Sequence, residues 1–255
     1  MQIDADELLP FSRKSTALLL DIDGTLLDFA PTPREVWVDP DLLTTLKSLY
    51  AGLDGAVAFV SGRSISDIDL IFSPLQLPAV GGHGAEFRPD ITAGDAAHPP
   101  PLPSLIKREF AMISKIGRGV LIEDKGYALA LHYRLAPDKG PAVIEAVEKI
   151  RELIPPEAVE VMHGKFVVEI KPAATNKASG VHAMMREPAF KGRKPIFIGD
   201  DITDQTVFPI ISDYHGQCFS VGHRMAGTDG CFDDPTAVRA WLARAAESLE
   251  LVTEA

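Results

Sequence analysis

The stretch Thr16-Ala17-Leu18-Leu19-Leu20-Asp21-Ile22-Asp23-Gly24-Thr25 decides the fold of this chain. Its first five residues form the mostly apolar run typical of a buried strand, and two carboxylates separated by one residue follow. Carboxylates this close repel each other, so a cation or a shared proton is expected at Asp21 and Asp23. Hard cations such as Mg²⁺ prefer such oxygen ligands. A turn or capping cluster is the alternative, because Asp-Gly is a common turn pair.

The same pattern recurs along the chain, where short apolar runs alternate with stretches of helical spacing. Further strands are predicted over 56–60, 196–198 and 218–221, and helices are predicted to begin at Asp39-Pro40, Ser64 and Asp234-Pro235. Strands that alternate with helices indicate a parallel sheet covered on both faces, with ligands beyond the carboxyl ends of the strands. Asp21, Ser61 and Asp200 lie at such ends.

The middle of the chain has a different pattern, between two proline-containing breaks at 98–103 and 171–175. Residues 127–134 and 165–170 alternate with period two, and 138–154 has a helical stripe. Period-two strands favour an antiparallel sheet with one face on helices and one face open. We therefore predict an α/β core over 1–103 and 175–255, interrupted by a small α+β insert over 104–174.

A second acidic cluster and two cationic segments complete the candidate site. Gly199-Asp200-Asp201-Ile202-Thr203-Asp204 follows a predicted strand, and a helix N-cap is its simplest alternative explanation. Ser61-Gly62-Arg63 offers a hydroxyl, an open backbone and a guanidinium where a strand meets a helix, which suits a phosphate. Lys177 follows a predicted N-cap, Asn176; a lone lysine is more often part of a solvated face.

Composition narrows the class of protein. The 255 residues are 46% hydrophobic and 24% charged, which argues against disorder. A net charge of −11 argues against a nucleic-acid partner, although a local cation cluster can still attract an anionic substrate. Cys218 and Cys231 lack a disulfide or metal spacing. The N-terminus has no signal-peptide pattern and no apolar run approaches ~18 residues, so we expect a cytoplasmic protein without a membrane partner.

The four segments DIDGT, SGR, NK and GDD-x-x-D resemble, in order and strand context, the haloacid dehalogenase-like (HAD) phosphohydrolases. The resemblance implies a Rossmann-like core with Asp21 as the nucleophile and Asp23 as the general acid and base. It implies phosphate binding by Ser61, Gly62, Arg63 and Lys177. It also implies a Mg²⁺ cofactor held by Asp21, the backbone carbonyl of Asp23, and Asp200, with Asp201 or Asp204 in support.

Within that superfamily the insert lies where the larger α/β cap occurs, and most of the chain resembles the trehalose-6-phosphate phosphatases. Stretches that carry this likeness are LLLDIDGTL, FVSGR, GGHGAEFR, EDKGYALALHYR, GKFVVEIKP, NKASGV and FIGDDITDQTVF. The resemblance implies an enzyme of trehalose biosynthesis that binds its sugar through Glu123, Lys125, Gly164, Lys165 and Glu169. Arg134 is a further candidate for sugar binding, and His83 in the Gly-rich turn 81–84 either lines the cleft or is a structural histidine. Two positions depart from the family pattern: Gln205, where Glu is usual, and Ala178, where many members have Gly.

Other functions remain open at this point. Sucrose-phosphate and mannosyl-3-phosphoglycerate phosphatases and phosphomannomutases share DxDGT, and the cap sequence discriminates against them. A catalytically silent sugar-phosphate-binding regulator is the alternative from another class, and the intact Asp21 and Asp23 argue against it. A monomer is compatible with the sequence, which does not determine the oligomeric state.

Overall fold

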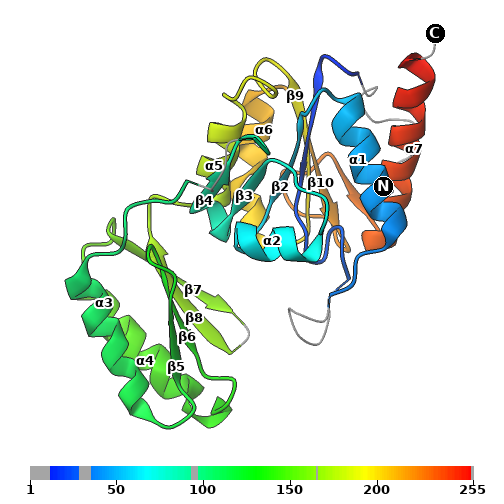
Figure 1. Ribbon diagram of the computed structural model, residues 1–255. Helices are drawn as coiled ribbons and strands as arrows, with labels where there is room; N and C mark the ends of the chain where they lie inside the picture. The colour runs from blue at the N-terminus through cyan, green and yellow to red at the C-terminus, as the bar shows by residue number, and fades with distance from the viewer. Residues whose placement is uncertain (1–11, 29–35, 93–96, 165, 254–255) are drawn as a thin grey trace. The chain divides into compact units, whose positions relative to one another are not determined.

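The computed structural model describes residues 12–28, 36–92, 97–164 and 166–253. The chain divides into two compact units, which Figure 1 shows in the colours of the chain. The first unit comprises Met1–Ala97 and Asn176–Ala255, and the second is His98–Thr175. The proline-rich stretch 98–103 therefore groups with the second unit.

The first unit is built on a seven-stranded sheet with the order β11-β10-β9-β1-β2-β3-β4. The described neighbours pair in parallel except β3 and β4, which are antiparallel. The strands are β1 (Thr16–Leu20), β2 (Val57–Val60), β3 (Ala79–Gly81), β4 (Glu86–Arg88), β9 (Lys194–Gly199), β10 (Gln217–Val221) and β11 (Gly230–Phe232). Every residue of β1 and β2 is buried, as expected of strands covered on both faces. The predicted parallel α/β fold is confirmed.

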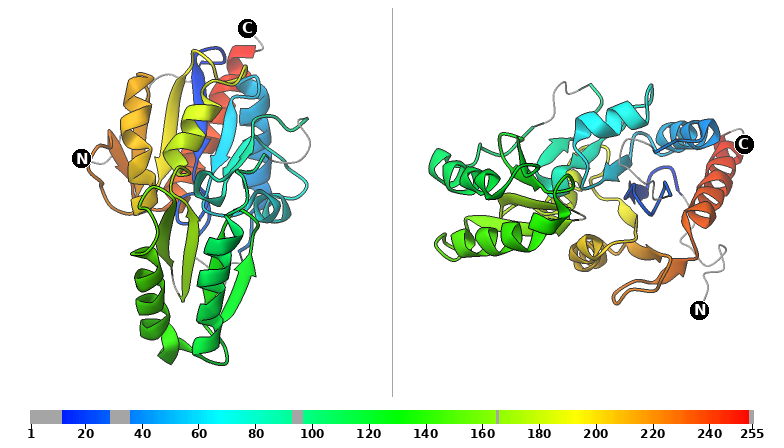
Figure 2. Two further views of the ribbon diagram at one scale, coloured as in Figure 1. Left: turned by 90° about the vertical axis from the view of Figure 1, so that its left-hand side faces the viewer. Right: turned by 90° about the horizontal axis from the view of Figure 1, so that it is seen from below.

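Helices cover this sheet on both faces (Figures 1 and 2). α1 (Pro40–Gly52) and α7 (Pro235–Thr253) lie side by side, and α5 (Lys177–Met184) and α6 (Phe208–Asp213) pack on the opposite face. The predicted helix starts are confirmed: the Asp39 carboxylate caps α1, and the Ser64 hydroxyl caps α2 (Ile65–Ile71) by accepting from the Asp67 N–H at 3.1 Å.

The second unit is a four-stranded antiparallel sheet with the order β5-β6-β8-β7. Its strands are β5 (Leu121–Asp124), β6 (Leu129–His132), β7 (Val159–Gly164) and β8 (Val167–Pro172). One face packs on α3 (Ser104–Ala111) and α4 (Gly140–Arg151), where Leu131 and Val168 meet Val143 and Val147 in a separate apolar core. The predicted alternation and helix are present, but β8 begins later than expected because Phe166 has a φ of +64° and belongs to the preceding turn.

None of the helices within the described ranges combines the length and the apolar character needed to span a bilayer.

Candidate active site

The side chains predicted for phosphate chemistry gather at one edge of the first unit's sheet. Asp21 follows β1, Asp200 follows β9 and Ser61 follows β2, and these three strands are neighbours. Lys177 is the first residue of α5, whose N-cap Asn176 forms a reciprocal capping box with Ser179. The fold thus brings together, from four separate segments, groups that are up to 179 positions apart.

Lys177 is the centre of a buried network. Its ammonium donates to Asp21 Oδ1 at 2.8 Å and to Asp204 Oδ1 at 2.6 Å. The three side chains are exposed by only 3%, 6% and 0%, so these are ion pairs shielded from water. The other oxygen of Asp204 accepts from the Asp201 N–H at 3.0 Å. Asp204 is therefore held on both sides and fixes the lysine beside Asp21.

Three carboxylates form a cluster that could hold a metal ion. One oxygen from each of Asp21, Asp200 and Asp204 lies within 4.8 Å of the others. Thr25, which is fully buried, donates its hydroxyl to Asp200 Oδ1 at 3.2 Å. With Lys177 charged, the ionised cluster keeps two negative charges, which matches one divalent cation. Hard oxygen donors in this number fit Mg²⁺, which usually completes its shell with water and phosphate oxygens.

Burial shifts the pKa values of the carboxyl groups and of the lysine in this cluster. Desolvation raises the pKa of Asp21 to about 7, against the opposing effect of Lys177. Desolvation likewise raises the pKa of Asp204 to about 7, with repulsion from Asp21 adding to it, and raises that of Asp200 to about 6. Burial lowers the pKa of Lys177, but Asp21 and Asp204 outweigh it and hold the lysine above its usual range. Buried carboxyls beside a charged lysine are typical of a functional site.

Asp23 and Arg63 make a pair of their own. The Arg63 Nε donates to Asp23 Oδ2 at 2.6 Å and its Nη2 donates to Oδ1 at 2.5 Å. The backbone N–H of Arg63 donates to the Ser61 hydroxyl oxygen at 3.2 Å. Ser61 can therefore direct its own proton elsewhere, such as to a phosphate oxygen. The side chain of Asp23 contributes no oxygen to the carboxylate cluster among the described residues.

Asp201 and the two positions that differ from the family pattern, Gln205 and Ala178, lie outside the carboxylate cluster. Asp201 is exposed and caps the short 3₁₀ helix η5 (Ile202–Thr206) by accepting from the Ile202 N–H at 2.6 Å. Gln205 is exposed on η5, so its side chain is not among the buried groups. Ala178 is buried on α5, with 8% exposure. Among the described residues, neither side chain makes a hydrogen bond in the network around Lys177.

The turn at 81–84 packs against two segments of the site, at Gly62 and at Asn176. The ring of His83 covers Gly62 so closely that a Cβ there would lie 2.4 Å from it. Gly84 has a φ of +97°, and a Cβ on it would lie 2.0 Å from the carbonyl oxygen of Asn176. Because Asn176 caps the helix that begins with Lys177, this turn sets where the lysine starts.

Alanine in place of Gly84 should therefore damage both stability and activity. The left-handed backbone and the clash with Asn176 together should lower the free energy of unfolding by about 2–5 kcal/mol. Gly192→Ala is the matched control, since Gly192 has a φ of +79° with nothing within 4 Å of its Cβ. It should cost about 1 kcal/mol and leave turnover intact. Urea unfolding measures the loss of stability, and the catalytic rate measures the loss of activity. Equal losses in the two variants would contradict the positioning role of the turn.

The predicted sugar-binding residues of the second unit lie mainly on one face of its sheet. Cross-strand register places Glu123, Ala130 and Glu169 in one row. Lys125 donates to Glu169 Oε1 at 3.2 Å, and His132 Nε2 lies 2.9 Å from Glu123 Oε2. Arg134 is exposed beyond the end of β6, and Gly164 ends β7. Lys165 lies outside the described residues.

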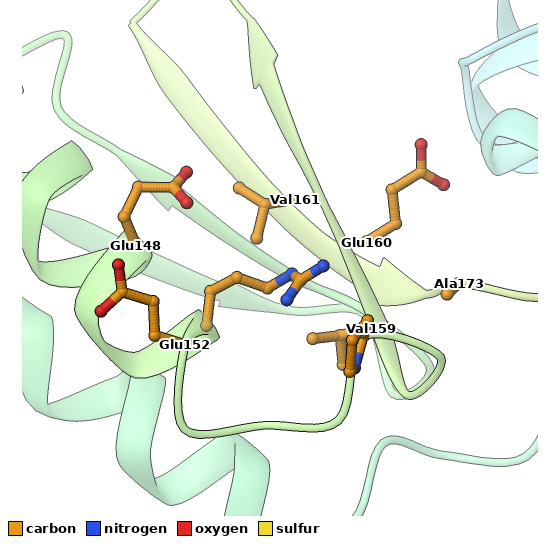
Figure 3. Close-up of a pocket in the computed structure, with 8 residues that line it drawn as sticks. Glu148, Glu152, Val159, Glu160, Val161 and Ala173 are labelled. Atoms are coloured by element: carbon orange, nitrogen blue, oxygen red, sulfur yellow. The ribbon is translucent and has the colours of Figure 1, made fainter.

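A hollow of about 490 Å³ in the second unit contains none of the predicted site residues (Figure 3). It is formed by the end of α4 and by β7, and Glu148, Glu152 and Glu160 outnumber the single arginine, Arg151. This lining repels anions, so the hollow does not suit a phosphate ester.

Comparison with known proteins agrees with this geometry. Residues 19–229 match the family model described as trehalose-phosphatase. The chain belongs to the trehalose-phosphatase family. It is 42% identical over 222 residues to a probable trehalose-phosphate phosphatase of Sinorhizobium fredii, covering 87% of this chain and 83% of the relative. It is 38% identical over 210 residues to the trehalose-6-phosphate phosphatase of Escherichia coli, covering 81% and 77%.

The fold is likewise that of this family. The C-terminal domain of Candida albicans trehalose-6-phosphate phosphatase superposes with a TM-score of 0.74 at 21% identity, covering 92% of this chain and 93% of that one. A solved structure described as a phosphatase of the HAD superfamily, from Bacteroides thetaiotaomicron, shares the fold with a TM-score of 0.65 at 16% identity, covering 96% of this chain and 99% of that one. The predicted α/β fold with a second, smaller sheet is confirmed.

Two contacts within the candidate site were not predicted from the sequence. The first is the hydrogen bond from the Thr25 hydroxyl to Asp200. The DxDGT motif could have indicated it, because the threonine directly follows the turn. The pairing of Arg63 with Asp23 had no local signal, since the residues are 40 positions apart and an arginine beside a serine equally suggests phosphate binding.

Proposed function

We propose that this protein is a phosphatase that hydrolyses trehalose 6-phosphate to trehalose and inorganic phosphate, the last step of trehalose biosynthesis. The observation that carries the proposal is the buried Asp21–Lys177–Asp204 network, joined by Asp200, in a member of the trehalose-phosphatase family. The proposed site belongs to a cytoplasmic enzyme that acts on a small sugar phosphate.

In the first half-reaction, an oxygen of the Asp21 carboxylate attacks the phosphorus of the ester. The bond between phosphorus and the sugar oxygen breaks, and that oxygen takes its proton from Asp23. Lys177 and the hydroxyl of Ser61 hold the phosphate oxygens during this step. The positive charge of Lys177 reduces the repulsion between carboxylate and phosphate, which would otherwise oppose the attack.

In the second half-reaction, water attacks the phosphorus of the aspartyl phosphate and gives a proton to Asp23. The bond from phosphorus to Asp21 breaks, and the nucleophile is restored. When bound by Asp21, Asp200 and the backbone carbonyl of Asp23, with Asp204 in support, Mg²⁺ would supply charge stabilisation for the transferring phosphoryl group. Within this proposal the Asp201 side chain does not bind the metal. Asp201 contributes only its backbone N–H, which donates to Asp204.

A phosphate-release assay across a panel of sugar phosphates, with and without Mg²⁺, tests the function. Trehalose 6-phosphate should be hydrolysed with the highest kcat/KM, ahead of sucrose 6-phosphate, glucose 6-phosphate and mannosyl-3-phosphoglycerate. A higher efficiency on another ester would replace the substrate assignment. Tight binding of trehalose 6-phosphate without phosphate release would favour the regulator, although Asp21 and Asp23 are both present.

Metal binding should weaken as pH falls. Protons and Mg²⁺ compete for the oxygens of Asp21, Asp200 and Asp204, whose pKa values are raised to about 7, 6 and 7. The apparent Mg²⁺ affinity, measured by calorimetry, should drop at least about tenfold between pH 7.5 and pH 5.5. Asp200→Asn should weaken binding at both pH values and reduce this dependence. An affinity that does not change with pH would contradict the proposed ligands.

We further propose that the open face of the second unit's sheet binds the sugar. Glu123→Gln or Glu169→Gln removes a charged partner for a hydroxyl, so kcat/KM for trehalose 6-phosphate should fall about ten- to a hundredfold. 4-Nitrophenyl phosphate should be hydrolysed nearly as before. Asp124→Asn is the control, because Asp124 on β5 pairs with Lys107 and lies on the opposite face from Glu123. Equal losses on both substrates would make the two glutamates structural.

A further inference from the structure

We propose that Arg63 is a positioning residue for Asp23 and not a phosphate ligand. Its guanidinium fixes the carboxyl group that exchanges a proton with the sugar oxygen. The inference rests on the proposed function, from which it takes the acid and base role of Asp23. It changes the role that the Ser-Gly-Arg segment suggests from sequence alone.

The contact between the two side chains is the first argument. Two nitrogens of one guanidinium meet the two oxygens of one carboxylate, at 2.6 and 2.5 Å. This fork-to-fork arrangement fixes both the distance and the rotation of the carboxyl group, which a lysine or a single hydrogen bond cannot do. Arg63 is only 13% exposed, so solvent competes little for its donors. The pair therefore selects one orientation of Asp23.

The backbone on both sides of the pair is also held. The Arg63 N–H donates to the Ser61 hydroxyl oxygen, and its carbonyl accepts from the Gly82 N–H at 2.7 Å. A Cβ on Gly81 would lie 2.9 Å from that carbonyl oxygen, so the close approach depends on glycine. On the other side, the Gly24 N–H donates to the Leu27 carbonyl at 2.8 Å and closes the turn that carries Asp23. Arg63 and Asp23 therefore both extend from backbone segments that are held in place by hydrogen bonds.

Charge argues against a phosphate role for the guanidinium. The positive charge of Arg63 faces the Asp23 carboxylate at 2.5 Å, which offsets its attraction for a dianionic phosphate. Lys177, at the head of α5 and beside Asp21, is the cation adjacent to the nucleophile. When Asp23 carries its proton, one oxygen can keep the hydrogen bond from Arg63 while the other presents the proton to the leaving sugar oxygen. The proton then passes to that oxygen as the bond from phosphorus to it breaks.

The test compares two leaving groups in Arg63→Gln and Arg63→Lys. For Arg63→Gln, kcat for trehalose 6-phosphate should fall about ten- to a hundredfold, because the acid is no longer aligned. For 4-nitrophenyl phosphate, whose leaving group needs no proton, the rate of nitrophenolate release in the first turnover should change less than about threefold. Later turnovers can slow on both esters, because Asp23 is also the base of the second half-reaction. Arg63→Lys keeps the charge without the fork and should recover only part of the loss. Adding Arg63→Gln to Asp23→Asn should cost less than about threefold more, since the residues act as a unit.

Arg88→Lys is the matched control. Arg88 makes the same two-pronged contact with Asp69, at 2.6 and 2.7 Å, elsewhere in the same unit. It should lower stability without changing the ratio of the two rates. Equal losses of the first-turnover rate on both esters in the Arg63 variants would overturn the proposal, and a parallel loss of inhibition by inorganic phosphate would make Arg63 a phosphate ligand. Full additivity with Asp23→Asn would also overturn it.

Misfolding of a variant and failure of the proposed function can each be distinguished from failure of the proposed role of Arg63. If Arg63→Gln does not fold, as judged by circular dichroism, Arg63→Lys and its double variant with Asp23→Asn decide the question. If the unaltered enzyme does not hydrolyse trehalose 6-phosphate but does hydrolyse another alkyl phosphate, the proposed function fails. The comparison of leaving groups is then made with that ester, and the same ratios support or overturn the role of Arg63.

Discussion

Asparagine in place of Asp21 should bring the turnover of trehalose 6-phosphate down to the background rate. Asn has the same size but no negatively charged oxygen to attack phosphorus, so the aspartyl phosphate cannot form. Removing a nucleophile that acts with its neighbours as a unit costs about 10⁴–10⁶ in kcat. Unlike the losses expected at the sugar-binding face, this one should be the same for 4-nitrophenyl phosphate, because both esters need the nucleophile.

The fold should survive the Asp21→Asn replacement. The amide oxygen can still accept from Lys177, and Asp204 continues to pair with the ammonium at 2.6 Å. Burial raises the pKa of Asp21 to about 7, so the folded state without metal loses stability as pH rises from about 4 to 7 and this carboxyl must ionise. Asn does not ionise, so above pH 7 the variant should unfold at the same temperature as the parent or higher.

Phosphate release measures the expected loss of turnover in Asp21→Asn. Thermal unfolding at pH 8 checks that the fold survives. Asp67→Asn on the exposed side of α2 is the control, and it should leave rate and stability unchanged. A residual rate above about a hundredth of the parent's would contradict the nucleophile assignment. Loss of the folded state would show that the charge of Asp21 is needed to hold Lys177.

The carboxyl-end cluster could be predicted because its signals are local. Five buried residues in β1 followed by a carboxylate already predict a strand end, and Asp200 repeats this after β9. Parallel strands place such ends at one edge of the sheet, so proximity follows from topology. The caps of α1, α2 and α5 were predictable for the same reason, since each requires only neighbours in sequence.

Edge strands escaped prediction because they carry mixed side chains. β5 and β7 lie at the two edges of the second unit's sheet, and most of their residues are at least partly exposed. Ile122 of β5 and Val159 and Val161 of β7 pack on the apolar core, but the polar and charged side chains around them leave an alternation too short to distinguish these strands from loops. β3 and β4, with three residues each, are too short to show any period. Ala130 is buried between its cross-strand neighbours Glu123 and Glu169.

The pairing of polar side chains is decided by tertiary geometry. Lys177, a lone lysine in the sequence, has two carboxylates within 3 Å, from segments 156 and 27 positions away. Arg63 could have faced a phosphate or a carboxylate, and its fixed backbone directs it to Asp23. Sequence indicates which groups reach the edge of the sheet, but the donors and acceptors that meet there follow from the packing.

Asp23→Asn should lower kcat for trehalose 6-phosphate by about 10²–10⁴, the usual contribution of a general acid–base group. Asn cannot give a proton to the sugar oxygen, which would have to leave as an unstable alkoxide. It also cannot take a proton from the attacking water. The amide oxygen can still accept from Arg63, so the Ser-Gly-Arg turn and its hydrogen bond to Ser61 should remain in place.

The leaving group separates the acid role from a structural one. 4-Nitrophenolate is stable without a proton, so the first half-reaction with 4-nitrophenyl phosphate should proceed in the Asp23→Asn variant. The second half-reaction still lacks its base, and the aspartyl phosphate should accumulate. Stopped-flow measurement should therefore show a burst of nitrophenolate close to one per enzyme, followed by slow turnover. Equal slowing of both esters with no burst would contradict the acid role, since an enzyme that cannot form the intermediate from an activated ester has lost more than a proton donor.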